Sequence, residues 1–135
     1  MDSSELQKKA CDARKYSHSP YSGHKVGAAV RVGKPGSPLF IGANIENASF
    51  GATVCAERVA IWKAMSEFPG EKIVEVAVCT DQNIPWPPCG LCLQVMAEFC
   101  APDTKVHLCD LQKIVKTVSF KELLPLNFNP EHLKR

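Results

Sequence analysis

The stretch P-P-C-G-L-C at residues 87–92 carries most of the information about this chain, because it places two cysteines three residues apart directly behind two prolines. Three residues are close to one helical turn, so the sulfurs of Cys89 and Cys92 project from the same side of a helix that begins here. The pair alone is compatible with a redox dithiol, half of a structural zinc site or half of a catalytic zinc site.

A third cysteine favours the catalytic zinc site. Cys55 lies in the first turn of another predicted helix, residues 54–68, which lacks Gly and Pro until its end. If a strand leads into each helix, the two helix N-termini lie side by side at the carboxyl ends of neighbouring strands. The partial positive charge of a helix N-terminus favours thiolate over thiol. Three thiolates would leave the fourth tetrahedral position of Zn²⁺ open, as a catalytic site requires.

Glu57 gives this metal site a chemical function. It follows Cys55 by two residues, so its carboxylate can exchange protons with a water that zinc acidifies, without binding the same ion. The known signature of zinc deaminases is H-x-E followed by P-C-x-x-C, and this chain has C-A-E in the place of H-x-E. The assignment therefore follows from a known signature.

The remaining sequence predicts one mixed α/β domain over residues 1–135. We expect an amphipathic first helix capped by Ser3 or Ser4, a hairpin, and a central strand that is too apolar to face water. S-F-K-E is a capping box for a last short helix, which Pro125 ends. The helices are expected at 3–16, 54–68 and 89–99, and the strands at 25–32, 39–44, 73–80, 105–110 and 114–118.

Composition excludes several classes of protein. Hydrophobic residues make up 45% and charged residues 22% of the 135, which is ordinary for a globular protein. The net charge is +2 with Lys and Arg scattered, so no nucleic acid partner is expected. No apolar run resembles a signal peptide or a membrane span, so we expect a cytoplasmic protein without a membrane partner. Seven cysteines in a reducing compartment favour metal binding or core packing over a disulfide framework.

With these motifs in place, the chain resembles the cytidine deaminase family over nearly its whole length. The resemblance rests on the Tyr16 to Ser22 segment, V-G-A-A, G-A-N-I-E-N-A-S, C-A-E-R, P-C-G-x-C-x-Q-V and E-L-L-P. It implies a three-layer α/β/α fold with a five-stranded mixed sheet, a homotetramer, and the hydrolysis of cytidine or deoxycytidine to the uracil nucleoside and ammonia in pyrimidine salvage.

The resemblance also implies roles for individual residues. One Zn²⁺ per chain is bound by three thiolates, a carboxylate shuttles protons, and polar side chains hold the ribose hydroxyls. A C-terminal aromatic residue reaches toward the site of a neighbouring subunit. By motif, the ligands are Cys55, Cys89 and Cys92, the proton shuttle is Glu57, the substrate residues are Asn44, Glu46, His24 and Phe128, and the residues supporting the ligands are Arg58 and Gln94.

Three departures from the family pattern bear on the substrate. His24 stands where the family commonly has a Phe that stacks on the base, and Leu93 replaces an arginine, so Arg58 alone offsets the thiolate charge. F-N-P replaces F-G-P around Phe128. Blasticidin S deaminases share C-A-E, P-C-G-x-C and a histidine next to V-G-A-A, but they lack N-I-E-N-A-S. That motif favours a nucleoside, and a modified cytosine compound is the alternative.

Other readings explain less of the sequence. A redox pair gives C-A-E no role, and a structural Cys₄ site would recruit a thiol expected in a strand or at a helix end, where cysteines are usually core filler. A non-catalytic binding protein or a nucleic-acid editor is opposed by the complete ligand set and the missing basic groove.

Trp86 directly precedes the zinc loop and could line the pocket mouth. The cysteines outside the motif are Cys11, Cys79, Cys100 and Cys109, and His18, His107 and His132 are expected at the surface or satisfied in the core.

Overall fold

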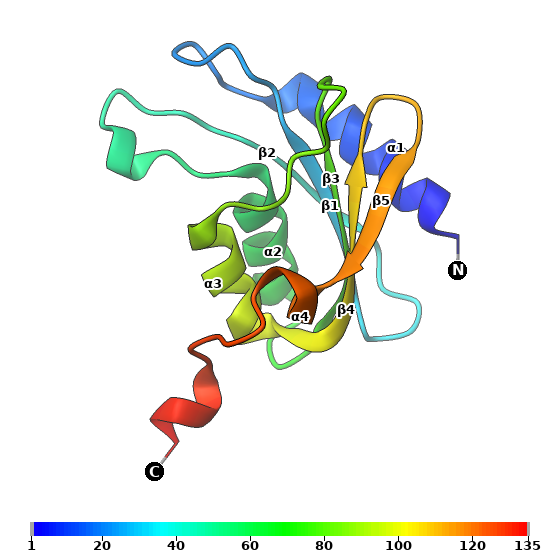
Figure 1. Cartoon of the computed structure of the whole chain (residues 1–135), viewed down its shortest axis with the longest axis vertical. Helices are drawn as coiled ribbons and strands as arrows, with labels where there is room; N and C mark the ends of the chain where they lie inside the picture. The colour runs from blue at the N-terminus through cyan, green and yellow to red at the C-terminus, as the bar shows by residue number, and fades with distance from the viewer. Residues whose placement is uncertain (1, 135) are drawn as a thin grey trace.

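The structure, a computed structural model, describes residues 2–134. Its centre is a five-stranded sheet in the order β2-β1-β3-β4-β5 (Figure 1). β3 and β4 are parallel, and the other neighbouring pairs are antiparallel, so the sheet is mixed as expected. The strands are β1 (Gly27–Val32), β2 (Phe40–Ala43), β3 (Ile73–Cys79), β4 (Cys100–Cys109) and β5 (Ile114–Ser119).

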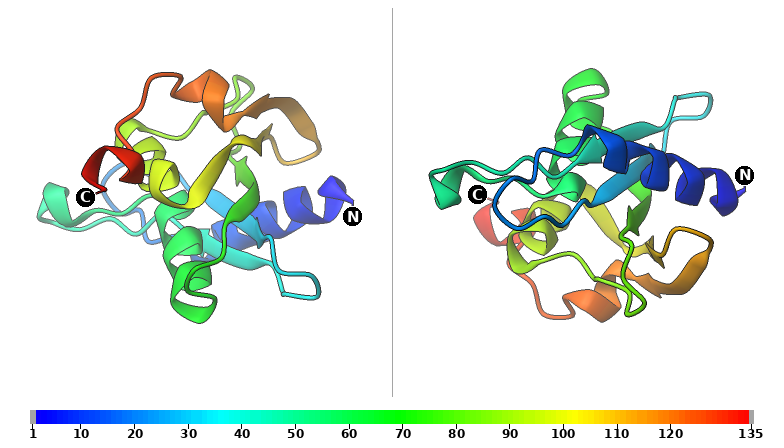
Figure 2. Two further views of the ribbon diagram at one scale, coloured as in Figure 1. Left: turned by 90° about the horizontal axis from the view of Figure 1, so that it is seen from below. Right: turned by 90° about the horizontal axis from the view of Figure 1, so that it is seen from above.

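Helices cover both faces of the sheet, which confirms the three-layer arrangement (Figures 1 and 2). α2 (Ala56–Glu67), α3 (Gly90–Phe99) and α4 (Phe120–Leu123) pack on one face and α1 (Ser3–Ala13) on the other. All six residues of β1 are buried. Ala28, Val30 and Val32 enter the core on one face of the sheet, and Ala29 enters the core on the other.

Glycine allows two helices to approach the sheet closely. A Cβ atom at Gly42 in β2 would lie 2.5 Å from the Ala60 nitrogen and 2.6 Å from the Ala56 carbonyl oxygen of α2. Gly27 in β1 contacts the backbone of α1 at Ala10 in the same way. The first turn of α2, which carries the C-A-E motif, is therefore placed by direct backbone contact with β2.

The structure corrects several predicted details. α1 ends at Ala13 and not at residue 16, and β4 begins at Cys100, five residues before the predicted strand. Asp2, and neither Ser3 nor Ser4, caps α1, because its Oδ1 accepts a hydrogen bond from the Ser4 backbone nitrogen at 2.9 Å. Cys55 and Cys89 are the N-cap residues of α2 and α3 and lie just before the first turn. The strands that lead into these helices, β2 and β3, are parallel but are separated by β1 and so are not neighbours.

The structure also contains a disulfide, although the sequence favoured metal binding or core packing for the cysteines. Cys11 on α1 is bonded to Cys79 at the end of β3, with 5.3 Å between their Cα atoms. The two residues meet because α1 crosses this end of the sheet, a proximity that a separation of 68 residues does not reveal. Cys100 and Cys109 are free and buried, as expected of core filler, and burial raises the pKa of each thiol to about 12.

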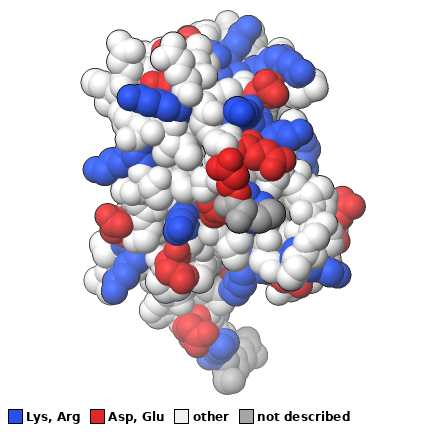
Figure 3. Space-filling view, turned by 90° about the vertical axis from the view of Figure 1, so that its right-hand side faces the viewer, with Lys and Arg blue, Asp and Glu red and all other residues white. Residues whose placement is uncertain are grey.

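The C-terminal part contains one confirmed prediction and one unpredicted element. Ser119 and Glu122 form both hydrogen bonds of the predicted capping box around the start of α4. A 3₁₀ turn, η3 (Pro130–Leu133), follows, and Figure 1 shows it extending away from the sheet. Within the described part of the chain, no helix has the length and apolarity needed to cross a bilayer. Basic and acidic side chains are interspersed on the face drawn in Figure 3.

Candidate active site

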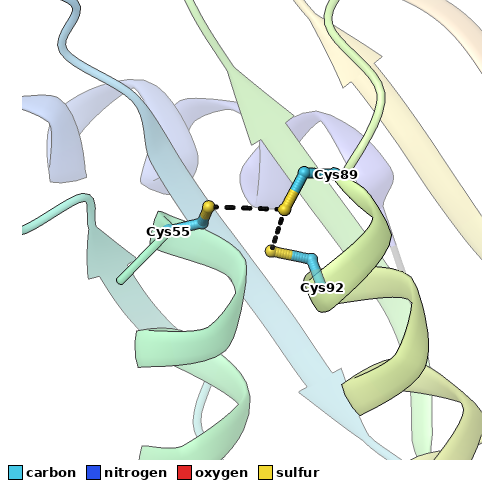
Figure 4. A group of neighbouring side chains, drawn as sticks. All are labelled: Cys55, Cys89 and Cys92. Atoms are coloured by element: carbon cyan, nitrogen blue, oxygen red, sulfur yellow. Dashed lines mark hydrogen bonds between the residues drawn. The ribbon is translucent and has the colours of Figure 1, made fainter. Parts of the chain in front are cut away.

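The three cysteines of the two motifs converge between the N-termini of α2 and α3 (Figure 4). The Sγ atom of Cys89 lies 3.6 Å from the Sγ atoms of both Cys55 and Cys92, and all three sulfurs lie within 4.8 Å of one another. Sulfur atoms at about 2.3 Å from one zinc ion in a tetrahedron are separated by roughly 3.8 Å. The sulfurs are therefore spaced as three ligands of one ion would be, and this group could hold a metal.

The electrostatics of the cluster also fit a cation. A hydrogen bond from Cys92 and the guanidinium of Arg58 lower the pKa of Cys55 to about 5, while the same hydrogen bond and burial raise the pKa of Cys92. Arg58 donates from Nη2 to the Cys55 sulfur at 3.5 Å, whereas its buried Nε has no hydrogen-bond partner. Thiols that share a proton in this way compete for it, and a divalent cation would satisfy all of them as thiolates.

Glu57 lies on the first turn of α2, two residues after Cys55, and is 4% exposed. Burial raises the pKa of its carboxyl group to about 7. A carboxyl group with such a pKa can both accept and donate a proton near neutral pH, which general acid–base catalysis requires. The position and the pKa of Glu57 both fit the role that the C-A-E motif indicated.

A cavity of about 350 Å³ opens beside the cluster. This volume lies within the usual range for sites that bind small molecules. Its walls come from the segment before β1, the loop after β2, the start of α2 and the loop before α3. Its lining includes His24, Asn44, Glu46, Glu57, Trp86 and Cys89.

The side chain of Asn44 is buried in the cavity wall, and the protein already uses most of its hydrogen-bonding capacity. Its Oδ1 accepts from Ser17 Oγ at 2.7 Å and from the Val26 backbone nitrogen at 2.9 Å, and its Nδ2 donates to the His24 carbonyl at 2.8 Å. An amide oxygen has two lone pairs and an amide nitrogen two hydrogens. One N–H group of Asn44 therefore remains for a ligand.

Glu46 also lines the cavity and is held there as a carboxylate. Its Oε1 accepts from the backbone nitrogens of Tyr21 at 2.9 Å and Ser22 at 3.1 Å, and its Oε2 accepts from the Ser22 hydroxyl. The Ser22 hydroxyl is the main cause that lowers the pKa of Glu46. Because an ionised carboxylate accepts about four hydrogen bonds, roughly one acceptor position is left for a ligand.

Two residues to which the family resemblance gives a role, Phe128 and Gln94, do not line this cavity. Phe128 is 55% exposed and stacks on His132, with 5.2 Å between the ring centroids, so it does not line the cavity of its own chain. Gln94 was expected to support the ligands, and the contact that the structure shows for its side chain is with the C-terminal segment. Its Nε2 donates to the Phe128 carbonyl at 2.8 Å, so it anchors the C-terminal segment to α3.

Reasoning from sequence missed the residues that orient the polar side chains of the cavity. Ser17 fixes Asn44, and Ser22 with Tyr21 fixes Glu46. All three lie in the Tyr16 to Ser22 segment that carries part of the resemblance, so the motif was visible although its purpose was not. Its function becomes clear only when the segment is seen beside the loop after β2, to which the main chain of His18 is bonded.

Comparison with known proteins gives consistent results. The family described as the cytidine and deoxycytidylate deaminase zinc-binding region matches residues 1–108. The chain is 49% identical to a cytidine deaminase of Halalkalibacterium halodurans over 133 residues, covering 98% of each protein. It is 38% identical to a cytidine deaminase of Sporosarcina psychrophila, covering 98% of this chain and 96% of the relative. The crystal structure of cytidine deaminase from Burkholderia pseudomallei superposes with a TM-score of 0.86 at 39% identity, covering 95% of this chain and all (100%) of that chain.

Proposed function

Because this chain belongs to the cytidine deaminase family, we propose that it hydrolyses cytidine or deoxycytidine to the uracil nucleoside and ammonia, and that residues 1–135 act as one domain. The observation that carries the proposal is a cluster of three thiols, two of which line one cavity together with a buried carboxyl group of raised pKa. We assign Cys55, Cys89 and Cys92 as the ligands of one zinc ion. Zinc would supply, when bound, the Lewis acidity that makes water nucleophilic near neutral pH.

Glu57 moves the protons of the reaction. As a carboxylate it takes a proton from the attacking water, and as an acid it delivers that proton to N3 of the pyrimidine, which makes C4 more electrophilic. It then transfers the remaining proton of the added hydroxyl group to the amino group, and the C4–N bond breaks as the C4 carbonyl forms, so that ammonia leaves. Burial of Glu57 supports this cycle, because a pKa of about 7 makes both protonation states accessible.

Arg58 offsets part of the negative charge of the three thiolate ligands. Three thiolates and Zn²⁺ carry a net charge of about −1, which would make the site less acidifying than one with neutral ligands. The hydrogen bond from Arg58 Nη2 to the Cys55 sulfur withdraws part of that charge. The Leu93 side chain has no hydrogen-bond donor, so of these two positions only Arg58 fills this role.

We assign Asn44 and Glu46 to the ribose. Their remaining donor and acceptor positions are complementary to hydroxyl groups, and both side chains are fixed by the protein before any ligand binds. Such preorganisation lowers the entropy lost on binding. It supports a nucleoside over a cytosine compound without a ribose.

The proposal includes a homotetramer, with a role in pyrimidine salvage in the cytoplasm. The loop between β2 and α2 projects from the body in both views of Figure 2 and carries Phe50, which is 76% exposed. Phe128, with its ring outside its own cavity, is also exposed. Exposed aromatic residues of this kind are typical of interfaces, and they support completion of each site by neighbouring subunits. Light scattering coupled to gel filtration will measure the oligomeric state.

The test of the activity is an ultraviolet assay of the purified protein with cytidine, deoxycytidine and blasticidin S in parallel, with zinc measured on the same sample. We expect turnover of a nucleoside with about one zinc per chain. Turnover of the antibiotic alone would keep the metal site and overturn the nucleoside assignment.

Glu57→Gln tests the proton shuttle in the same assay. The variant should keep its zinc, because the ligands are untouched, and should lose turnover by about 10²- to 10⁴-fold. Glu67→Gln is the matched control, since Glu67 is exposed at the other end of the same helix. Full activity of Glu57→Gln would exclude the mechanism, whereas loss of zinc would point to a structural role for Glu57.

A further inference from the structure

His24 and Trp86 form an aromatic pair in the wall of the cavity. Their ring centroids are 5.1 Å apart and their planes meet at 65°. Both residues line the cavity that contains Cys55 and Glu57, but they come from segments far apart in sequence, the stretch before β1 and the loop between β3 and α3. The two rings therefore make two walls of one corner.

The main chain on both sides of this corner is fixed. Trp86 is followed by two prolines, which restrict the backbone, and then by Cys89, the N-cap of α3. The His24 backbone nitrogen donates to Ser22 Oγ at 3.1 Å, and its carbonyl accepts from Asn44. The corner is thus tied to both the proposed metal site and the proposed ribose site, and its geometry does not depend on a mobile loop end.

A planar base that stacks on one of these rings lies parallel to it. The edge of the base then faces the second ring, at about the angle between the two ring planes. Stacked and edge-to-face arrangements are the two favoured geometries of aromatic groups, so one corner can satisfy both at once. A single aromatic residue would fix only the plane of the base. Two crossed rings also limit how the base slides and turns within that plane.

We propose that Trp86 is a further substrate-binding residue, which together with His24 forms an aromatic corner that holds the pyrimidine ring. The inference rests on the proposed function and deepens it. It also explains how a histidine works at position 24: the smaller imidazole is supplemented by an indole from the opposite segment.

Kinetics with a matched pair of variants test this role. Trp86→Ala should raise KM for cytidine about 5- to 50-fold, since an aromatic contact with a base is typically worth that much, and should change kcat far less. Trp86→Phe should recover most of the affinity. Ile84→Ala is the control, because Ile84 lies in the same loop, is 78% exposed and does not line the cavity.

A binding measurement keeps the test decisive if Trp86→Ala does not fold. The chain has two tryptophans, so Trp62→Phe in the Glu57→Gln background leaves Trp86 as the sole indole fluorophore. Cytidine should then change the emission of Trp86 saturably, with the dissociation constant that calorimetry gives for the same variant. Calorimetric binding without any change in emission would overturn the inference.

The outcomes separate this inference from the proposed function. A wild-type enzyme that turns over cytidine, with an unchanged KM in folded, zinc-loaded Trp86→Ala, would overturn the role of Trp86 alone. A zinc-loaded wild-type protein that neither binds nor deaminates cytidine would overturn the proposed function, and this inference with it.

Discussion

Glu46 shows how much of a substrate site is prepared by a few hydrogen bonds. Three donors from Tyr21 and Ser22 hold the carboxylate in one place and favour its ionised form. The conformational entropy of this side chain is lost during folding and not during binding. A ribose hydroxyl therefore encounters an acceptor that is already in position. The contribution of Glu46 to affinity is therefore concentrated in one remaining acceptor position.

Glu46→Gln tests that role. The amide replaces a charged acceptor by a neutral group, so we expect KM for cytidine to rise about 10- to 100-fold, the range expected for hydrogen bonds to charged groups. Zinc content should stay at that of the wild type, and kcat should fall less than kcat/KM. Steady-state kinetics with metal analysis on the same sample measure both, and an unchanged KM would remove Glu46 from the substrate site.

At the same scale, the sequence reveals ligands better than it reveals their surroundings. Cys89 and Cys92 share a helical turn and C-A-E is contiguous, so their geometry follows from local spacing. The Cys11–Cys79 pair and the contact of Gln94 with the C-terminal segment depend on how distant segments pack. No local pattern contains that information.

At the scale of elements, the position of α2 against β2 decides where the metal site forms. Gly42 lets the two backbones touch near Ala56, one residue after Cys55. Glycine in a strand often marks such an approach. The order of the predicted elements indicates a sheet covered by helices, but it does not predict how closely α2 approaches β2.

Gly42→Ala tests this contact. The added methyl group would overlap the backbone of α2, so we expect a loss of stability of about 1–3 kcal/mol, typical of overpacking, together with a reduced zinc content. Gly33→Ala is the control, because a Cβ atom at Gly33 makes only an ordinary contact, 3.4 Å from Val74. Urea unfolding and metal analysis measure the two effects. Equal behaviour of the two variants would show that the close approach does not place α2.

At the scale of the whole molecule, four strands are joined by a polar network on the face that α1 covers only in part. Glu75 of β3 accepts from Arg31 of β1 at 3.0 Å, and from His107 of β4 at 2.7 Å. His107 in turn bonds Thr117 of β5 at 2.8 Å, and Ser3 at the start of α1 donates to Glu75 at 2.8 Å. The sequence predicts that His107 is satisfied in the core or exposed, but its partners lie on other strands and could not be identified.

This network makes the stability of the fold depend on pH. Burial alone would raise the pKa of Glu75, but the hydrogen bonds from His107, Ser3 and Arg31 outweigh it and hold the pKa below its usual value. A carboxyl group whose pKa is lower in the folded than in the unfolded state stabilises the fold above the unfolded pKa of about 4.3. That contribution is lost as the pH falls through the lower, folded value.

Glu75→Gln should therefore lower the free energy of unfolding on the order of 1–3 kcal/mol at pH 7, the usual cost of leaving buried partners unsatisfied. The difference from the wild type should shrink as the pH falls from about 5 toward 3, because the wild-type carboxylate is then protonated too. Protonation of the metal ligands affects both proteins and cancels in the difference. Glu131→Gln, which removes an exposed ion pair with Lys134, should change the free energy of unfolding far less, because solvent screens such a pair. Urea unfolding across this pH range measures all three proteins, and a Glu75→Gln difference that stays constant with pH would show that the network contributes through shape and not through charge.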